Sequence, residues 1–116
     1  MVKTYNEEEQ SLSLKEIETL LTIFFGRIKD TYNQFRWKVE IIPSSGCGYA
    51  KTRINAIECY INVQMFFKKR FEVYIELVGK KVTSQNFPIT EKTPKELEEL
   101  ANTMFKWVKK QIEKFI

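Results

Sequence analysis

Residues 57–77 of this 116-residue chain read IECYINVQMFFKKRFEVYIEL, and this stretch decides the fold. Apolar and polar residues alternate over 57–65 and again over 71–77, the pattern of two strands that each bury one face. Between them, residues 66–70 form a basic, aromatic-rich turn. A third alternating run, FRWKVEI, occupies residues 35–41. Together the three runs predict an antiparallel sheet with one face buried and the other open to water.

Two helices are expected to flank this sheet. Ser13 and Glu16 form a capping-box pattern, and apolar residues follow at helical spacing as far as Tyr32. The second helix is expected to start at Thr93–Pro94, where threonine caps the helix and proline occupies its first position. Its wide apolar face extends to Ile116.

The predicted fold class is α+β: a helix, a three- or four-stranded antiparallel meander and a long C-terminal helix, with both helices on one face of the sheet. A fourth short strand is expected at 81–87, after the turn at Gly79–Lys80. Residues 43–55 either extend the second strand from Tyr49 onward or form a mobile flap. We expect residues 1–10 to be a flexible segment and 11–116 to be a single domain.

The composition argues against an enzyme. The chain has no histidine, which excludes histidine-based nucleophile activation, general acid–base catalysis and zinc ligation. Its two cysteines do not form a metal-binding pair: Cys47 is expected in a turn, and Cys59 on the buried face of a strand. No catalytic residue, metal or cofactor is therefore expected. Because no signal-like or membrane-spanning apolar run is present, we expect a cytoplasmic protein.

The positive charge is concentrated in the predicted sheet. Residues 31–89 carry nine Lys/Arg against four Glu, whereas residues 1–30 carry an acidic excess. Such a concentration favours contact with a polyanion. A surface kept charged for solubility is the alternative interpretation.

The open sheet face is the candidate binding surface, because alternation directs Tyr60 and Tyr74 outward from neighbouring strands. Single-stranded nucleic acid is held by aromatic rings that stack on bases and by cations that follow the backbone. Four outward glutamates, Glu40, Glu58, Glu72 and Glu76, dilute the positive charge. The predicted nucleic-acid-binding residues are Arg36, Lys38, Tyr49, Lys51, Arg53, Tyr60, Lys68, Lys69, Arg70 and Tyr74.

The layout resembles that of the thermophilic archaeal single-stranded DNA-binding proteins, the ThermoDBP-like group. The residues that carry the resemblance are the strand 35–39, the turn Pro43–Gly46 and the long helix from Pro94. The resemblance implies a DNA-binding protein in which a twisted antiparallel sheet and packed helices hold single strands in a basic, aromatic cleft, often as a homo-oligomer. The sequence leaves open whether the ligand is DNA or RNA.

A second class of function, a non-enzymatic protein-interaction module, is also compatible with the sequence. The apolar face of the last helix is wider than one sheet contact requires. A homodimer or higher oligomer would bury the excess, with Phe105, Trp107 and Ile116 at the interface.

Overall fold

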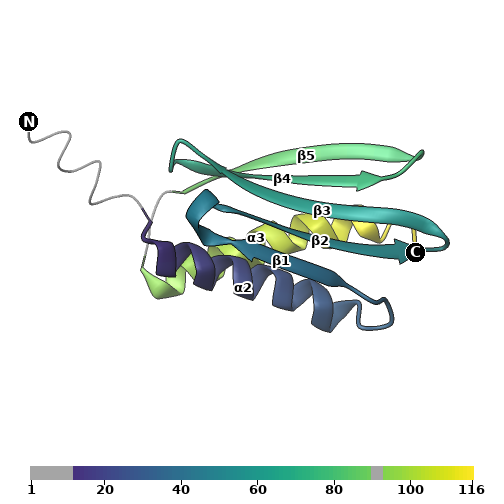
Figure 1. Cartoon of the computed structure of the whole chain (residues 1–116), viewed down its shortest axis with the longest axis horizontal. Coiled ribbons are helices and arrows are strands. Elements are labelled where there is room, and N and C mark those ends of the chain that lie inside the picture. The colour runs from purple at the N-terminus through teal and green to yellow at the C-terminus, as the bar shows by residue number, and fades with distance from the viewer. Residues whose placement is uncertain (1–11, 90–92) are drawn as a thin grey trace, which may run out of the picture.

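The computed structural model describes residues 12–89 and 93–116 (Figure 1). The fold is α+β, as predicted, and its sheet is an antiparallel meander in the order β1-β2-β3-β4-β5. The prediction of a flexible segment at 1–10 lies outside the described residues. In chain order the elements are α2 (Leu14–Thr31), β1 (Lys38–Ile42), the 3-10 turn η1 (Pro43–Ser45), β2 (Cys47–Ile54), β3 (Ile57–Phe66), β4 (Arg70–Leu77), β5 (Lys81–Pro88) and α3 (Pro94–Ile112).

Both predicted helix starts are confirmed, and their capping boxes are complete. The Glu16 amide donates to Ser13 Oγ at 3.1 Å, and the Ser13 amide donates to Glu16 Oε1 at 2.8 Å. At α3 the amides of Glu96 and Thr93 make the reciprocal pair, each at 3.3 Å. Because each box satisfies amides that the first helical turn leaves unpaired, local sequence alone fixes where both helices begin.

The predicted number of strands was wrong: the sheet has five strands, because residues 47–54 form a strand of their own between β1 and β3. The η1 turn reverses the chain before β2, and Gly46 (φ 63°) donates to the Pro43 carbonyl at 2.9 Å. Cys47 is therefore the first residue of a strand, not part of a turn. The expected strand at 81–87 is confirmed as β5, and the first strand begins at Lys38 rather than at residue 35.

The two helices pack against each other and against the sheet. Phe24 and Phe25 of α2 and Met104 of α3 are fully buried, together with inward-facing residues such as Ile61 and Phe71. This leaves the opposite sheet face open, and its side chains on β3 and β4 are only partly buried. The helices thus cover the buried face of each alternating strand.

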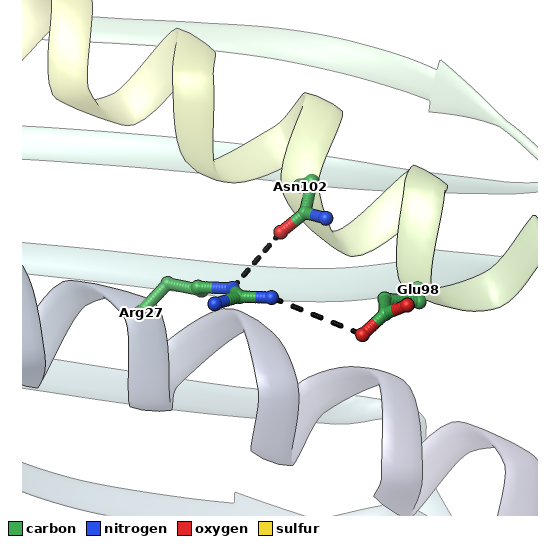
Figure 2. A network of polar contacts seen from close by, with 3 residues as sticks. All are labelled: Arg27, Glu98 and Asn102. Atoms are coloured by element: carbon green, nitrogen blue, oxygen red, sulfur yellow. Dashed lines mark hydrogen bonds and ion pairs between the residues drawn. The ribbon is translucent and has the colours of Figure 1, made fainter. Parts of the chain in front are cut away.

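A polar contact also joins the two helices at their surface, as Figure 2 shows. Arg27 of α2 donates from Nε to Asn102 Oδ1 at 3.0 Å, and its Nη2 lies 3.8 Å from Glu98 Oε2. Since both ionic side chains are about half exposed, this pair orients the helices more than it stabilises them. In the described part of the chain, neither helix is long and apolar enough to cross a lipid bilayer.

Candidate nucleic-acid interface

The open face is the sheet surface that the helices leave uncovered, and the strand register shows which side chains share it. Residues paired across neighbouring strands lie on the same face. The first row crosses the sheet as Lys38, Lys51, Tyr60, Glu76 and Val82, the second as Glu40, Tyr49, Asn62, Tyr74 and Ser84, and the third as Ile42, Cys47, Gln64, Glu72 and Asn86. Basic side chains thus gather in the first row, toward β1 and β2, and the glutamates of β4 lie on the other side.

Three tyrosines surround Asn62 in the middle of this face, and we call them the tyrosine triad: Tyr49, Tyr60 and Tyr74. Tyr49 and Tyr74 are the direct cross-strand partners of Asn62, one on each side. Tyr60 precedes Asn62 by two residues on β3, so its side chain shares the face. Tyr49, one of the predicted binding residues, therefore lies near the centre of this face. All three side chains are half-buried and present part of their rings to solvent.

Tyr60 also connects the triad to charged neighbours. Lys51 Nζ lies 5.8 Å from the centre of its ring, within the range of a cation–π contact. The Tyr60 hydroxyl donates to Glu58 Oε2 at 3.4 Å. The negative charge of Glu58 raises the pKa of Tyr60 above its ordinary value of 10.0, with smaller contributions from desolvation and from Glu76. One face of this ring is thus already next to a cation.

Four cations gather at one end of the open face, and we call this region, made of Arg36, Lys38, Lys51 and Arg53, the basic end. They line a cavity of about 450 Å³ together with Gln34, Phe35, Thr52 and Glu58. Lys38 and Lys51 are direct cross-strand partners, a like-charge pairing that destabilises a sheet. Ion pairs among the described residues are Arg27–Glu98 and Lys109–Glu113, and neither involves the basic end.

Hydrogen bonds brace the loop that carries Phe35 and Arg36. The indole Nε1 of Trp37 and the amide of Phe35 both donate to the Tyr32 carbonyl, at 3.0 and 3.2 Å. Thr52 Oγ1, which is buried on β2, donates to the Arg36 carbonyl at 2.7 Å. The rings of Phe35 and Trp37 pack edge to face, with centroids 6.4 Å apart. Hydrogen bonds and ring contacts with the interior of the molecule therefore hold the wall of the cavity in place.

Tyr32 in turn is anchored to α3. Its hydroxyl donates to Glu113 Oε2 at 3.3 Å, and Glu113 also pairs with Lys109 at 2.9 Å. Burial, followed by the charge of Glu113, raises the pKa of Tyr32 to about 12. The hydrogen bond from Lys109 is the main factor that lowers the pKa of Glu113. Both helix ends therefore contribute to holding the basic end.

The remaining predicted cations lie elsewhere, at the β3–β4 turn. We call residues 66–70 the tip. Glu58 and Phe66 are eight residues apart on β3, about 26 Å in an extended strand. In Figure 1 the β2–β3 turn lies near the C-terminus and the β3–β4 turn at the opposite end of the sheet. The structure therefore brings Arg36, Lys38, Lys51 and Arg53 together but separates them from Lys68, Lys69 and Arg70.

The tip has its own internal contacts. The guanidinium of Arg70 lies 5.1 Å from the ring centre of Phe66 and 5.7 Å from that of Phe67. Its Nε also donates to Asn86 Oδ1 at 3.1 Å. Phe67 and Lys68 both have positive φ, at 55° and 57°, and Phe67 is 78% exposed. Arg70 is thus already engaged, and Phe67 projects into solvent.

The residues predicted to form an oligomer interface differ in burial. Phe105 and Trp107 are half-buried and pack on the core, and Trp107 contacts Phe87 edge to face at 6.2 Å. Ile116 is 56% exposed. The wide apolar face of α3 is therefore used largely within the chain, against α2 and against β5.

Sequence analysis missed part of the cavity. Phe35 was predicted to be a strand residue, and Gln34 was not predicted to be a site residue. The aromatic Phe35 directly before Arg36 was the available signal for an apolar wall beside a cation. Cys59 is buried as predicted, and burial raises its pKa to about 11. Over the described ranges, 12–89 and 93–116, no cluster of three Cys, Asp or Glu side chains has the geometry of a metal site.

Comparison of the chain with protein-family models, with curated proteins and with solved structures found no match.

Proposed function

We propose that the open face binds single-stranded nucleic acid, with bases stacked on the tyrosine triad and phosphates held at the basic end. The observation that carries this proposal is the register, which gathers Tyr49, Tyr60 and Tyr74 around Asn62, next to the basic end, whose four cations form no ion pair with any residue that the structure describes. Base stacking on aromatic side chains contributes about 1–3 kcal/mol per base and tolerates any sequence. Asn62 supplies both a donor and an acceptor for a base edge.

The charge pattern favours a short path for the backbone. Glu72 and Glu76 lie on the β4 side of the triad, and Glu40 lies beside Tyr49 in the second row. Phosphates would be repelled there and attracted to the β1 and β2 side of the first row, where Lys38 and Lys51 lie. The favoured ligand is therefore a single strand that stacks a few bases on the protein and brings few of its phosphates into contact with it. This is in line with the ThermoDBP-like expectation of a basic, aromatic site. The surface is the face of a five-stranded sheet, which is wider than the α-helix or two-stranded ribbon that a major groove admits, so a single strand is the favoured ligand.

The protein-interaction alternative has less support. Phe105 and Trp107 are already half-buried within the chain, which leaves Ile116 as the exposed member of the expected interface. Light scattering over a range of concentrations measures the oligomeric state directly. A concentration-dependent dimer that the substitution Ile116→Asp disrupts would favour the alternative if the dimer also failed to bind an oligonucleotide, since a nucleic-acid-binding protein of this layout is itself expected to form oligomers.

A fluorescently labelled oligonucleotide tests the proposed function. We expect binding that weakens as salt increases. Binding releases cations that are condensed on the strand, and this release becomes less favourable at high salt. Tyr74→Ala removes a ring from the triad and should weaken binding about 5- to 150-fold, the range expected for one stacked base. Phe67→Ala is the matched control, since it removes an exposed aromatic ring at the tip. Lack of binding at low salt by a folded wild-type protein would overturn the proposal.

A further inference from the structure

We propose that the cavity at the basic end captures the terminal phosphate of the bound strand, so that the protein prefers a phosphorylated strand end. This inference rests on the proposed function and adds the part of the ligand that the cavity would take, a phosphomonoester. The charge of the cavity, its position on the sheet and its rigidity each favour such a ligand.

The charge of the lining exceeds what one backbone phosphate neutralises. Four cations and one carboxylate, Glu58, line the cavity. An internal phosphodiester carries one negative charge, whereas a phosphomonoester carries about −1.5 to −2 at neutral pH. Lys38 and Lys51 face each other across neighbouring strands without a carboxylate between them. A dianion placed beside both ammonium groups relieves their repulsion, and a diester does so only in part.

The side chains also suit a phosphate with several free oxygens. Arg36 and Arg53 each present a planar fork of donors, which binds two phosphate oxygens at once. A volume of about 450 Å³ is within the usual range for small-ligand sites and exceeds that of an isolated phosphate. Phe35 provides an apolar wall for the attached nucleoside. The cavity therefore fits a terminal nucleotide better than a free inorganic anion.

The position of the cavity explains why it would take an end of the strand. It lies where β2 leads into the β2–β3 turn. Arg53 and Glu58, which both line it, form the cross-strand pair of the open face that lies nearest to this turn. The Asn55 side chain donates to the Phe115 carbonyl at 3.2 Å, so this turn is held against the C-terminal end of the chain. A strand that follows the tyrosine triad toward the basic end reaches the edge of the platform at the cavity.

A rigid backbone at the basic end favours a specific binding site over non-specific attraction to scattered cations. Arg36 is held at its carbonyl by Thr52, and the next residue, Trp37, is tied to the Tyr32 carbonyl. Side chains whose backbone is already ordered lose less entropy when they bind a ligand. The basic end therefore has the fixed backbone that end recognition requires.

Three oligonucleotides of one sequence test the inference on the full chain: one with a 5′-phosphate, one with a 3′-phosphate and one with no terminal phosphate. We expect one phosphorylated end to bind about tenfold tighter than the unphosphorylated strand, as charge-assisted hydrogen bonds to one additional charge would produce. Arg53→Gln should remove this preference. Lys106→Gln, which removes an exposed charge on α3, should retain it. Equal affinities for the three strands would overturn the inference, even if Arg53→Gln failed to fold.

A nucleoside monophosphate separates this inference from the proposed function. If the monophosphate binds to wild-type protein and Arg53→Gln weakens it, the cavity is a phosphomonoester site whether or not strands bind. If all strands bind equally and the monophosphate does not bind, the open face retains its function and the inference fails. If neither strands nor monophosphate bind, both proposals fail.

Discussion

The basic end and the tip have similar residue types, yet they are built in opposite ways. At the basic end, Arg36, Lys38, Lys51 and Arg53 come from a loop and two strands and surround a concave surface. At the tip, three consecutive cations project from a tight turn, and Arg70 is already occupied by two phenyl rings and Asn86. A similar density of positive charge is thus present at both ends. The basic end differs in that its four cations line a cavity, where one ligand could contact several of them at once.

The two ends also differ in how they are held. Behind the basic end, Tyr32, Trp37 and Thr52 connect the loop to both helices and to β2. At the tip, the side chain of Arg70 donates to Asn86 of β5. Both turns contain two consecutive residues with positive φ, a conformation that is costly for residues other than glycine: Asn55 and Ala56 beside the basic end, and Phe67 and Lys68 in the tip. The two ends therefore share backbone strain, and the cavity at the basic end is the reason to expect that they contribute differently to binding.

The largest expected difference concerns affinity for a single strand. Lys51→Gln/Arg53→Gln should weaken binding about 150-fold or more at low salt, since two charged groups are lost and hydrogen bonds to such groups contribute about 1.5–3 kcal/mol each. Lys68→Gln/Lys69→Gln removes the same charge at the tip and should weaken binding less than about threefold, because only long-range attraction is lost. Titration of a labelled oligonucleotide at several salt concentrations measures both.

The salt dependence provides a second readout for this pair of variants. Each lost phosphate contact lowers the slope of log affinity against log salt by about 0.7 for a single strand. We therefore expect a clearly smaller slope for the basic-end variant and an unchanged slope for the tip variant. Equal losses for both variants would mean that the strand spans the whole sheet, and the distinction between the two ends would be wrong.

Local sequence was sufficient for the parts of the fold that are governed by local rules. Capping boxes fixed the starts of both helices, and strict alternation identified β3 and β4 with their outward tyrosines. Strand β2 was predicted only as one alternative, an extension of the next strand from Tyr49 onward, because three of its four inward positions, Gly48, Ala50 and Thr52, are small and give little apolar signal. At Gly48 the reason is close packing by α2, since a Cβ atom there would lie 2.8 Å from Cε2 of Phe25. That is tertiary information, which no window of sequence contains.

The candidate site was only partly predictable for the same reason. Without β2 as a separate strand, nothing aligns Lys51 with Lys38 or places Arg53 near Arg36. The outward direction of Tyr60 and Tyr74 followed from alternation, but the central position of Tyr49 depends on the register of β2. Types of residue were therefore predictable, and their division between two ends of the sheet was not.

A smaller effect is expected from alkaline pH, and it concerns the bracing of the basic end. Folding raises the pKa of Tyr32 from 10.0 to about 12, so the folded state retains the phenolic proton more tightly than the unfolded state does. The contribution of Tyr32 to stability is then fully present below about pH 10 and is lost as the pH rises through about 12. Tyr32→Phe should reduce this alkaline loss of the free energy of unfolding.

Urea unfolding at about pH 8 and at about pH 11.5 measures the difference between wild type and Tyr32→Phe. Cys59, with a pKa raised to about 11, titrates in the same range in both proteins, so the comparison isolates Tyr32. If both proteins lose the same stability between the two pH values, the Tyr32 hydroxyl is not buried against Glu113, and the proposed anchoring of the loop is wrong.

The smallest expected effect compares the two turns themselves. Ala56, in the turn beside the basic end, and Lys68, in the tip, have φ of 66° and 57°, and both are exposed. A left-handed conformation costs an L-residue about 1–2 kcal/mol, and glycine avoids this while losing about 0.5–1 kcal/mol of chain entropy on folding. Ala56→Gly and Lys68→Gly should therefore each raise the free energy of unfolding by about 0.5–1 kcal/mol, as measured with urea.

These two glycine variants also test whether the two ends differ in binding, since each relieves backbone strain at one end. Ala56→Gly creates an Asn-Gly turn, which is the preferred sequence for a two-residue hairpin, and removes no charge. It should leave oligonucleotide affinity unchanged. Lys68→Gly stabilises the tip but removes a cation, so an affinity loss well above threefold would identify the tip as part of the binding surface. Stabilisation without such a loss would show that strain at the tip is independent of the nucleic-acid site.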